Sequence, residues 1–157
     1  MKIITFSILA IALILTVETR AEFYTVTQSF YVPGKDCQLI WIGIYNDQGT
    51  RDKSDDRLLK YDVFIRCNNP INQPDKNTNE PLEKHTVAIT PGNCAAYISA
   101  LTRGGYKSHK AEVDYLVKIA HEIDKGFTDE SVTSFFNLIE NAPESFKPFI
   151  EKAEVTH

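Results

Sequence analysis

Residues 37–45 read CQLIWIGIY and residues 58–67 read LLKYDVFIRC, and these two stretches decide the fold. The first is apolar at almost every position, which is typical of a central strand covered on both faces. The second alternates between apolar and polar residues, as a strand with one buried face does. The polar loop between them, residues 46–57, predicts that the two strands form an antiparallel hairpin. The expected core face of the second strand carries Leu59, Tyr61, Val63 and Ile65.

Two further strands are expected, one before and one after this hairpin in the sequence. Residues 23–32 (FYTVTQSFYV) are rich in β-branched and aromatic residues and end at a Pro-Gly turn signal. Residues 84–90 (KHTVAIT) form a shorter candidate strand. The segment before it, residues 68–83, contains three prolines and almost nothing apolar, which indicates a loop.

The second half of the chain has the spacing of helices. Apolar residues recur three and four positions apart after Cys94, across residues 108–125 and after Thr128, which can cap its helix together with Ser131. Thr90 is the expected N-cap of the first of these helices. A short last stripe is formed by Phe146, Phe149, Ile150 and Ala153. This order indicates an α+β fold, with a small antiparallel sheet from the N-terminal half packed against three to four C-terminal helices.

Residues 1–21 have the three parts of a secretory signal peptide. The start is short and positive, residues 3–17 (IITFSILAIALILTV) are uncharged, and Thr19 and Ala21 are small residues at the positions that signal peptidase recognises. Cleavage is therefore expected after Ala21, which leaves residues 22–157 as one globular domain, secreted and extracellular. The apolar run is shorter than the roughly 20 residues that span a bilayer, so no membrane span is expected.

Charge and motifs argue against several kinds of partner. Loss of residues 1–21 removes two basic side chains and one acidic one, which brings the net charge from −4 to −5. Lys and Arg are scattered, so no nucleic-acid partner is expected. His121-Glu122 begins like a zinc-protease helix, but the fifth position is Lys125 rather than histidine. The aspartates of the 46–57 loop lack the order of a calcium loop, and we expect no metal and no cofactor.

Three cysteines in an oxidising compartment give one disulfide and one leftover thiol. If the hairpin pairs residues whose numbers sum to 104, Tyr61 faces Gly43 and Cys37 faces Cys67, within disulfide reach. We therefore predict a Cys37–Cys67 disulfide with Cys94 free. Pairings of Cys94 with Cys67 or with Cys37 remain open as alternatives.

Cys94 also allows a catalytic hypothesis, because the pKa of a thiol in the first turn of a helix is lowered by the helix dipole. Residues 93–98 (NCAAYI) resemble the Asn-Cys-x-x-Phe-Val start of the nucleophile helix in lecithin:retinol acyltransferase-like enzymes. This resemblance implies that Cys94 is the nucleophile of a thiol-dependent hydrolase or acyltransferase. The base in that family is a histidine just before a tryptophan, whereas Ile40 precedes Trp41 here. The alternatives are a buried core position for Cys94, or a homodimer linked through it.

The aromatic residues of the 23–32 strand indicate a binding surface. Phe23 and Tyr31 fall on one face of this strand, and Tyr24 and Phe30 fall on the other. If helices cover only one face of the sheet, some of these rings stay exposed, as at a partner or ligand site. The favoured function is therefore a secreted non-enzymatic effector or binding protein of the salivary, venom, immune-modulating or inhibitor type. It would act on an extracellular macromolecule or a small apolar ligand.

Overall fold

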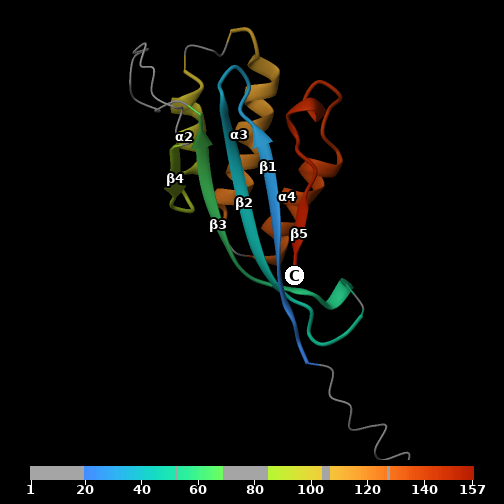
Figure 1. The fold of residues 1–157 in the computed structure, drawn as a ribbon. Helices are drawn as coiled ribbons and strands as arrows, with labels where there is room; N and C mark the ends of the chain where they lie inside the picture. Colours follow the sequence, from blue (N-terminus) through green and yellow to red (C-terminus); the bar gives the residue numbers. More distant parts are fainter. Residues whose placement is uncertain (1–19, 52, 69–84, 104–106, 127) are drawn as a thin grey trace, which may run out of the picture.

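The computed structural model describes residues 20–51, 53–68, 85–103, 107–126 and 128–157. In this part of the chain the strands form one antiparallel sheet in the order β4-β3-β2-β1-β5, and the α-helices lie on one face of it (Figure 1). The strands are β1 (Phe23–Tyr31), β2 (Cys37–Asn46), β3 (Arg57–Cys67), β4 (His85–Ile89) and β5 (Glu154–Thr156). The helices are α2 (Cys94–Leu101), α3 (Lys110–Asp124) and α4 (Asp129–Glu140), with 3-10 turns η1 (Lys53–Asp55) and η2 (Lys147–Phe149).

The predicted α+β fold, a small antiparallel sheet packed against C-terminal helices, is confirmed by this arrangement. Thr128 and Ser131 form the capping box of α4, as the sequence predicts, whereas the first of the three helices begins at Cys94 and not directly after Thr90. The predicted signal peptide lies outside the described residues up to position 19, and so does the proline-containing loop from position 69 to 83. Both of those assignments stay predictions.

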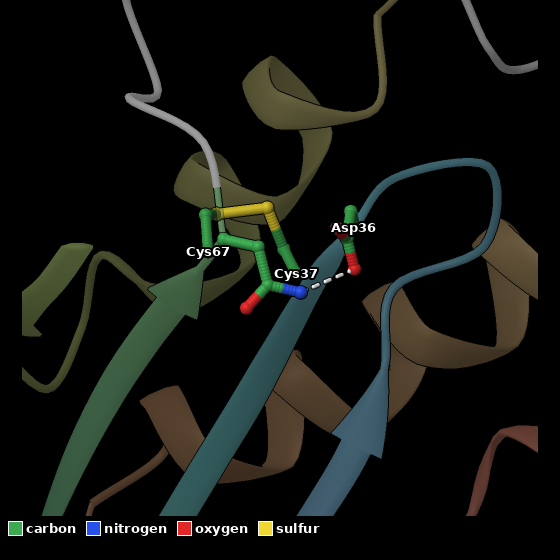
Figure 2. Close-up of a disulfide and its surroundings, with 4 residues drawn as sticks. Asp36, Cys37 and Cys67 are labelled. Carbon is green, nitrogen blue, oxygen red and sulfur yellow. Dashed lines mark hydrogen bonds between the residues drawn. A yellow bond between two sulfur atoms is a disulfide. The ribbon is translucent and has the colours of Figure 1, made fainter. Parts of the chain in front are cut away.

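The register between β2 and β3 is the predicted one. Cys37 pairs with Cys67, and Gly43 pairs with Tyr61. The Asn68 N–H donates to the Asp36 carbonyl at 3.1 Å, so the cysteines occupy the adjacent pair that shares no backbone hydrogen bonds. Their Cα atoms are 4.0 Å apart and their sulfur atoms form a disulfide, which closes the two strands at one end of the hairpin (Figure 2).

A β-bulge changes the register at the other end of the hairpin. The pairing shifts between Ile44 and Tyr45, so Tyr45 pairs with Leu58. Leu58 therefore packs on the core, while Leu59 is 41 % exposed. The prediction that Leu59 lies on the core face is wrong, because one extra residue in a strand reverses the direction of the side chains that follow.

The indole ring of Trp41 lies at the centre of the core between the sheet and the helices. It stacks with the Tyr61 ring at a centroid distance of 6.0 Å and contacts the Phe135 ring of α4 at 5.1 Å. A Cβ atom added to Gly43 would lie 2.8 Å from Cζ3 of Trp41 and closer still to Cη2. Gly43 is therefore required where it stands, because the indole ring lies against the backbone at that position.

The last apolar stripe does not form the fourth helix that the sequence allows. Pro148 stands within the short turn η2, and a proline N atom cannot donate a helical hydrogen bond. After η2 the chain runs beside β1: Ile150 bridges to Phe30, and the Glu151 N–H donates to the Ser29 carbonyl at 3.1 Å. Strand β5 then pairs with β1, so the C-terminus completes a sheet that the N-terminal half begins.

The contact between Trp41 and Gly43 gives a prediction about stability. We expect Gly43→Ala to lower the free energy of unfolding by about 1–3 kcal/mol, because the added methyl group overpacks the core. Urea unfolding of the disulfide-intact protein measures this change. Trp41→Phe removes the two ring atoms that the methyl group would meet, so Gly43→Ala should cost at least about 1 kcal/mol less in that background. An equal cost in both backgrounds would contradict the assigned packing.

Candidate ligand-binding site

The sheet has a second face, which no helix of the described residues covers (Figure 1). Because side chains alternate along a strand, the neighbours of the buried Leu39 and Trp41, namely Ile40 and Ile42, point to this open face. Within the described residues, the expectation that residues 37–45 are covered by other elements on both faces is therefore not met. Ile40 is nevertheless only 7 % exposed, because the neighbouring side chains of the open face surround it.

The strand register arranges the side chains of the open face in rows. Each row crosses β3, β2 and β1 in turn, and strand pairing places its members directly opposite one another. Three successive rows, counted from the disulfide end of the hairpin, are Arg66–Gln38–Tyr31, Phe64–Ile40–Ser29 and Asp62–Ile42–Thr27. These rows bring Ile40, Ile42 and Phe64 together, with polar side chains of the same rows on both sides of them.

A hollow of about 410 Å³ lies over the middle of the open face. Its apolar floor consists of Ile40, Ile42 and Phe64, and its hydroxyl groups come from Thr27, Ser29 and Thr86. Its charged side chains are Arg66, Glu151, Lys152 and Glu154. Most small-molecule sites combine an apolar lining with a few polar groups in this way.

Gln38 connects the two sides of the hollow. The Arg66 Nη2 atom donates to the Gln38 Oε1 atom at 3.0 Å, and the Gln38 Nε2 atom donates to the Glu151 Oε2 atom at 3.3 Å. This chain of hydrogen bonds holds Arg66 and Glu151 above the apolar floor. Among the described residues, neither Arg66 nor Lys152 forms a salt bridge, so both cations can interact with an anionic group of a ligand.

Two of the aromatic residues predicted to bind a partner make their contacts within the protein instead. Phe30 is fully buried and packs edge-on against Phe135, so it supports the sheet and cannot contact a ligand directly. Tyr24 stacks on Tyr45 at a centroid distance of 5.3 Å, and its hydroxyl group donates to a carboxylate oxygen of Asp56. Burial and this carboxylate both raise the pKa of Tyr24. Tyr24 therefore fastens the hairpin loop to β1.

The other two predicted aromatic residues are exposed but lie apart. Phe23 is 62 % exposed and Tyr31 is 44 % exposed. They stand at opposite ends of β1, about 26 Å from each other along the strand. Tyr31 belongs to the row of Arg66 and Gln38, which places it near the hollow but outside its lining. Its role in binding, like that of Phe23, stays a prediction.

Most residues of the hollow were missed by the sequence analysis. The alternation in residues 58–67 contained a signal, because Phe64 is apolar but falls between the core residues Val63 and Ile65. The uninterrupted apolar run of β2 contained a second signal, because it has apolar residues on both faces of the strand. No pattern indicated Glu151, Lys152 or Glu154, because they reach the hollow only after the C-terminal segment has paired with β1.

Cys94 lies in the first turn of α2, as predicted, but its surroundings differ from those of a nucleophile. The residue is fully buried, and this burial, with the nearby Asp124 carboxylate, raises the pKa of the thiol to about 12. The carboxylate accepts hydrogen bonds from the backbone N–H groups of Gly92, Cys94 and Ala95 at 3.1, 2.8 and 2.9 Å. Asp124 therefore occupies the helix terminus that was expected to stabilise a thiolate.

The same contacts correct the expected cap of α2. The N-cap position is Asn93, whose side chain makes no capping hydrogen bond, and Thr90 lies outside the helix. The cap comes instead from Asp124, thirty residues later in the sequence at the end of α3. A disulfide between two copies through Cys94 would require this capped turn to open, because the thiol is enclosed.

Comparison of the chain with protein-family models, with curated proteins and with solved structures finds no match. Within the described ranges, no helix has the length and the apolar composition to cross a bilayer. Over the same ranges, no three His, Cys, Asp or Glu side chains gather where they could hold a metal ion. The function is therefore inferred from the hollow and the residues that line it.

The burial of Cys94 predicts slow alkylation. At pH 8, iodoacetamide should modify Cys94 in the native protein at least about 100-fold more slowly than in urea, because the native thiol is enclosed and protonated. Mass spectrometry over time measures both rates. Asp124→Ala should increase the native rate, since it removes the cap and the adjacent negative charge. Equal native and denatured rates would contradict the buried position.

The same pKa shift predicts how stability depends on pH. The pKa of Cys94 is higher in the folded protein than its ordinary value of 9.0. Its contribution to stability is therefore complete below pH 9.0 and is lost as the pH rises from there towards about 12. Cys94→Ser, whose hydroxyl group does not ionise in this range, should lose less stability over that interval in urea unfolding.

Proposed function

We propose that this chain is a secreted, non-enzymatic binding protein, which holds a small amphipathic ligand in the hollow on the open face of its sheet. The ligand has an apolar body that lies on Ile40, Ile42 and Phe64, and a polar or anionic end near Arg66 and Lys152. The observation that carries this proposal is the apolar floor surrounded by charged and hydroxyl groups, on a sheet face that none of the described helices covers.

The size of the hollow favours a small ligand over a protein partner. Its volume of about 410 Å³ falls in the range of small-molecule sites, about 300–1,000 Å³. A stable protein interface needs about 800 Å² from each partner, with large exposed anchors near its centre. The exposed rings of Phe23 and Tyr31 stand too far apart to serve as one such centre.

A rigid floor supports the binding hypothesis. Two of the three floor residues lie on β2, which pairs with a neighbouring strand on each side. The other face of β2 carries Trp41, which packs into the core. The Cys37–Cys67 disulfide closes the end of the hairpin nearest to Arg66. A preformed surface loses little conformational entropy on binding, which favours affinity for a small molecule.

Two observations support secretion. Residues 1–21 have the sequence pattern of a signal peptide, and an intramolecular disulfide is compatible with an oxidising compartment. The thiol-enzyme alternative has no such support, because Cys94 is buried and the pKa of its thiol is raised.

The proposed site can be tested with 1-anilinonaphthalene-8-sulfonate, a fluorescent probe with an aromatic body and one sulfonate group. We expect saturable binding at one site, with increased probe fluorescence. Ile42→Gln should weaken binding about three- to tenfold, because it removes roughly 1 kcal/mol of apolar contact. At low salt, Arg66→Gln by itself should weaken binding more than Ile42→Gln does, because the sulfonate group of the probe loses its cationic partner.

Matched controls come from the same strands. Ile44→Gln makes the same change two positions along the same face of β2, outside the lining of the hollow, and should leave binding unchanged. Lys60→Gln is the corresponding control for Arg66→Gln on β3. Unfolding curves and near-UV circular dichroism check that each variant remains folded. Equal losses for Ile42→Gln and Ile44→Gln would contradict a site at the hollow.

A further inference from the structure

The backbone of Glu22 meets the side chain of Asp47 where β1 and β2 lie beside the hairpin loop. The Glu22 N–H donates to the Asp47 Oδ1 atom at 2.8 Å, and the Asp47 N–H donates to the Glu22 carbonyl at 3.1 Å. These contacts continue the ladder one residue beyond the pair Phe23–Asn46. The nitrogen of Glu22 is therefore already held against a carboxylate.

The Asp47 carboxylate is fixed in place by its own turn. The Gly49 N–H also donates to its Oδ1 atom, at 2.8 Å. The backbone N–H groups of Glu22 and Gly49 lower the pKa of Asp47, so this side chain is charged at neutral pH. A positive charge on the nitrogen of Glu22 would thus meet a negative charge that is already oriented toward it.

The peptide bond before Glu22 is the one that the signal-peptide pattern marks for cleavage. Arg20, Ala21 and Glu22 are exposed and have no regular secondary structure, so a peptidase can reach this bond. Hydrolysis adds water across the bond: Ala21 keeps a carboxylate, and the Glu22 nitrogen becomes an α-ammonium group at neutral pH.

We propose that cleavage after Ala21 creates a salt bridge between the new α-ammonium group of Glu22 and the Asp47 carboxylate, so that processing strengthens the hairpin end of the sheet. This inference rests on the secretion included in the proposed function. The hydrogen bond from the Glu22 amide to the Asp47 carboxylate, in which only the acceptor is charged, becomes one in which donor and acceptor are both charged, with the same geometry. Cleavage one residue earlier or later would move the α-ammonium group by one residue, about 3.8 Å along the chain from the position that faces Asp47.

Other ionisable groups lie near this salt bridge. The Glu22 carboxylate belongs to the same residue, and His157 at the C-terminus lowers the pKa of Asp47. Tyr24 lies between His157 and Tyr45, and Asp56 accepts its hydroxyl hydrogen bond. The acidic groups favour the new cation, and they raise its pKa above the ordinary value of about 7.7–8.0.

The test compares two chains, residues 22–157 and residues 21–157, each released from a removable N-terminal fusion. All strands and helices of the described fold lie within both chains. The longer chain keeps the amide hydrogen bond to Asp47 and loses only the charge at that position. At pH 6.5 and low salt, the chain that begins at Glu22 should unfold about 1–3 °C higher.

The pH dependence follows from the raised pKa of the α-ammonium group. The extra stability is complete below about pH 7.7 and is lost as the pH rises through the higher folded-state pKa. About 1 M salt should also reduce it. In Asp47→Asn, which keeps an oxygen acceptor without the charge, the two chains should unfold at the same temperature. Equal unfolding temperatures with Asp47 present, or a difference that persists in Asp47→Asn, would overturn the salt bridge.

Processing itself is tested on the whole chain. Cells that secrete the product of residues 1–157 should release a protein whose intact mass begins at Glu22, and a different N-terminus would overturn the processing step. Probe binding on the two mature chains separates this result from the proposed function. The hollow lies further along the sheet, so a failure to bind the probe leaves the unfolding difference unchanged.

Discussion

The pairing of β2 with β3 in one register is the constraint on which the rest of the structure depends. It sets Trp41 opposite Val63 and Gly43 opposite Tyr61, on the face that the helices cover. A slip of one residue would reverse the facing of one of the two strands, so that its core side chains would point to the open face. The disulfide at one end and the indole ring over Gly43 nearer the other both oppose such a slip.

The same register also builds the candidate site. Side chains between the core residues of β2 and β3 must point away from the helices, which brings Ile40, Ile42 and Phe64 together on the open face. Charged groups then surround them, from Arg66 on β3 and from the segment that leads into β5. The core and the hollow thus lie on opposite faces of the same pair of strands, and the packing of the core keeps the floor of the hollow rigid.

The first turn of α2 illustrates how a partner from distant sequence changes local chemistry. A cysteine in the first turn of a helix usually gains acidity, but here the Asp124 carboxylate from α3 takes the backbone N–H groups and burial keeps the thiol protonated. At the C-terminal end of the helix, the buried Thr102 Oγ1 atom donates a hydrogen bond to the Ile98 carbonyl oxygen at 2.7 Å. The helix is therefore built as a structural element on the sheet.

The sequence by itself determined the α+β class and the hairpin register, favoured the Cys37–Cys67 pairing, and placed Cys94 in the first turn of a helix, because hydrophobic periodicity depends on near neighbours. Only the tertiary structure decided the bulge beside Tyr45, the capping role of Asp124, the pairing of β5 with β1 and the hollow beside Arg66. Each of these joins segments that are far apart in the chain or depends on which sheet face the helices cover, and no local pattern of residues records such contacts.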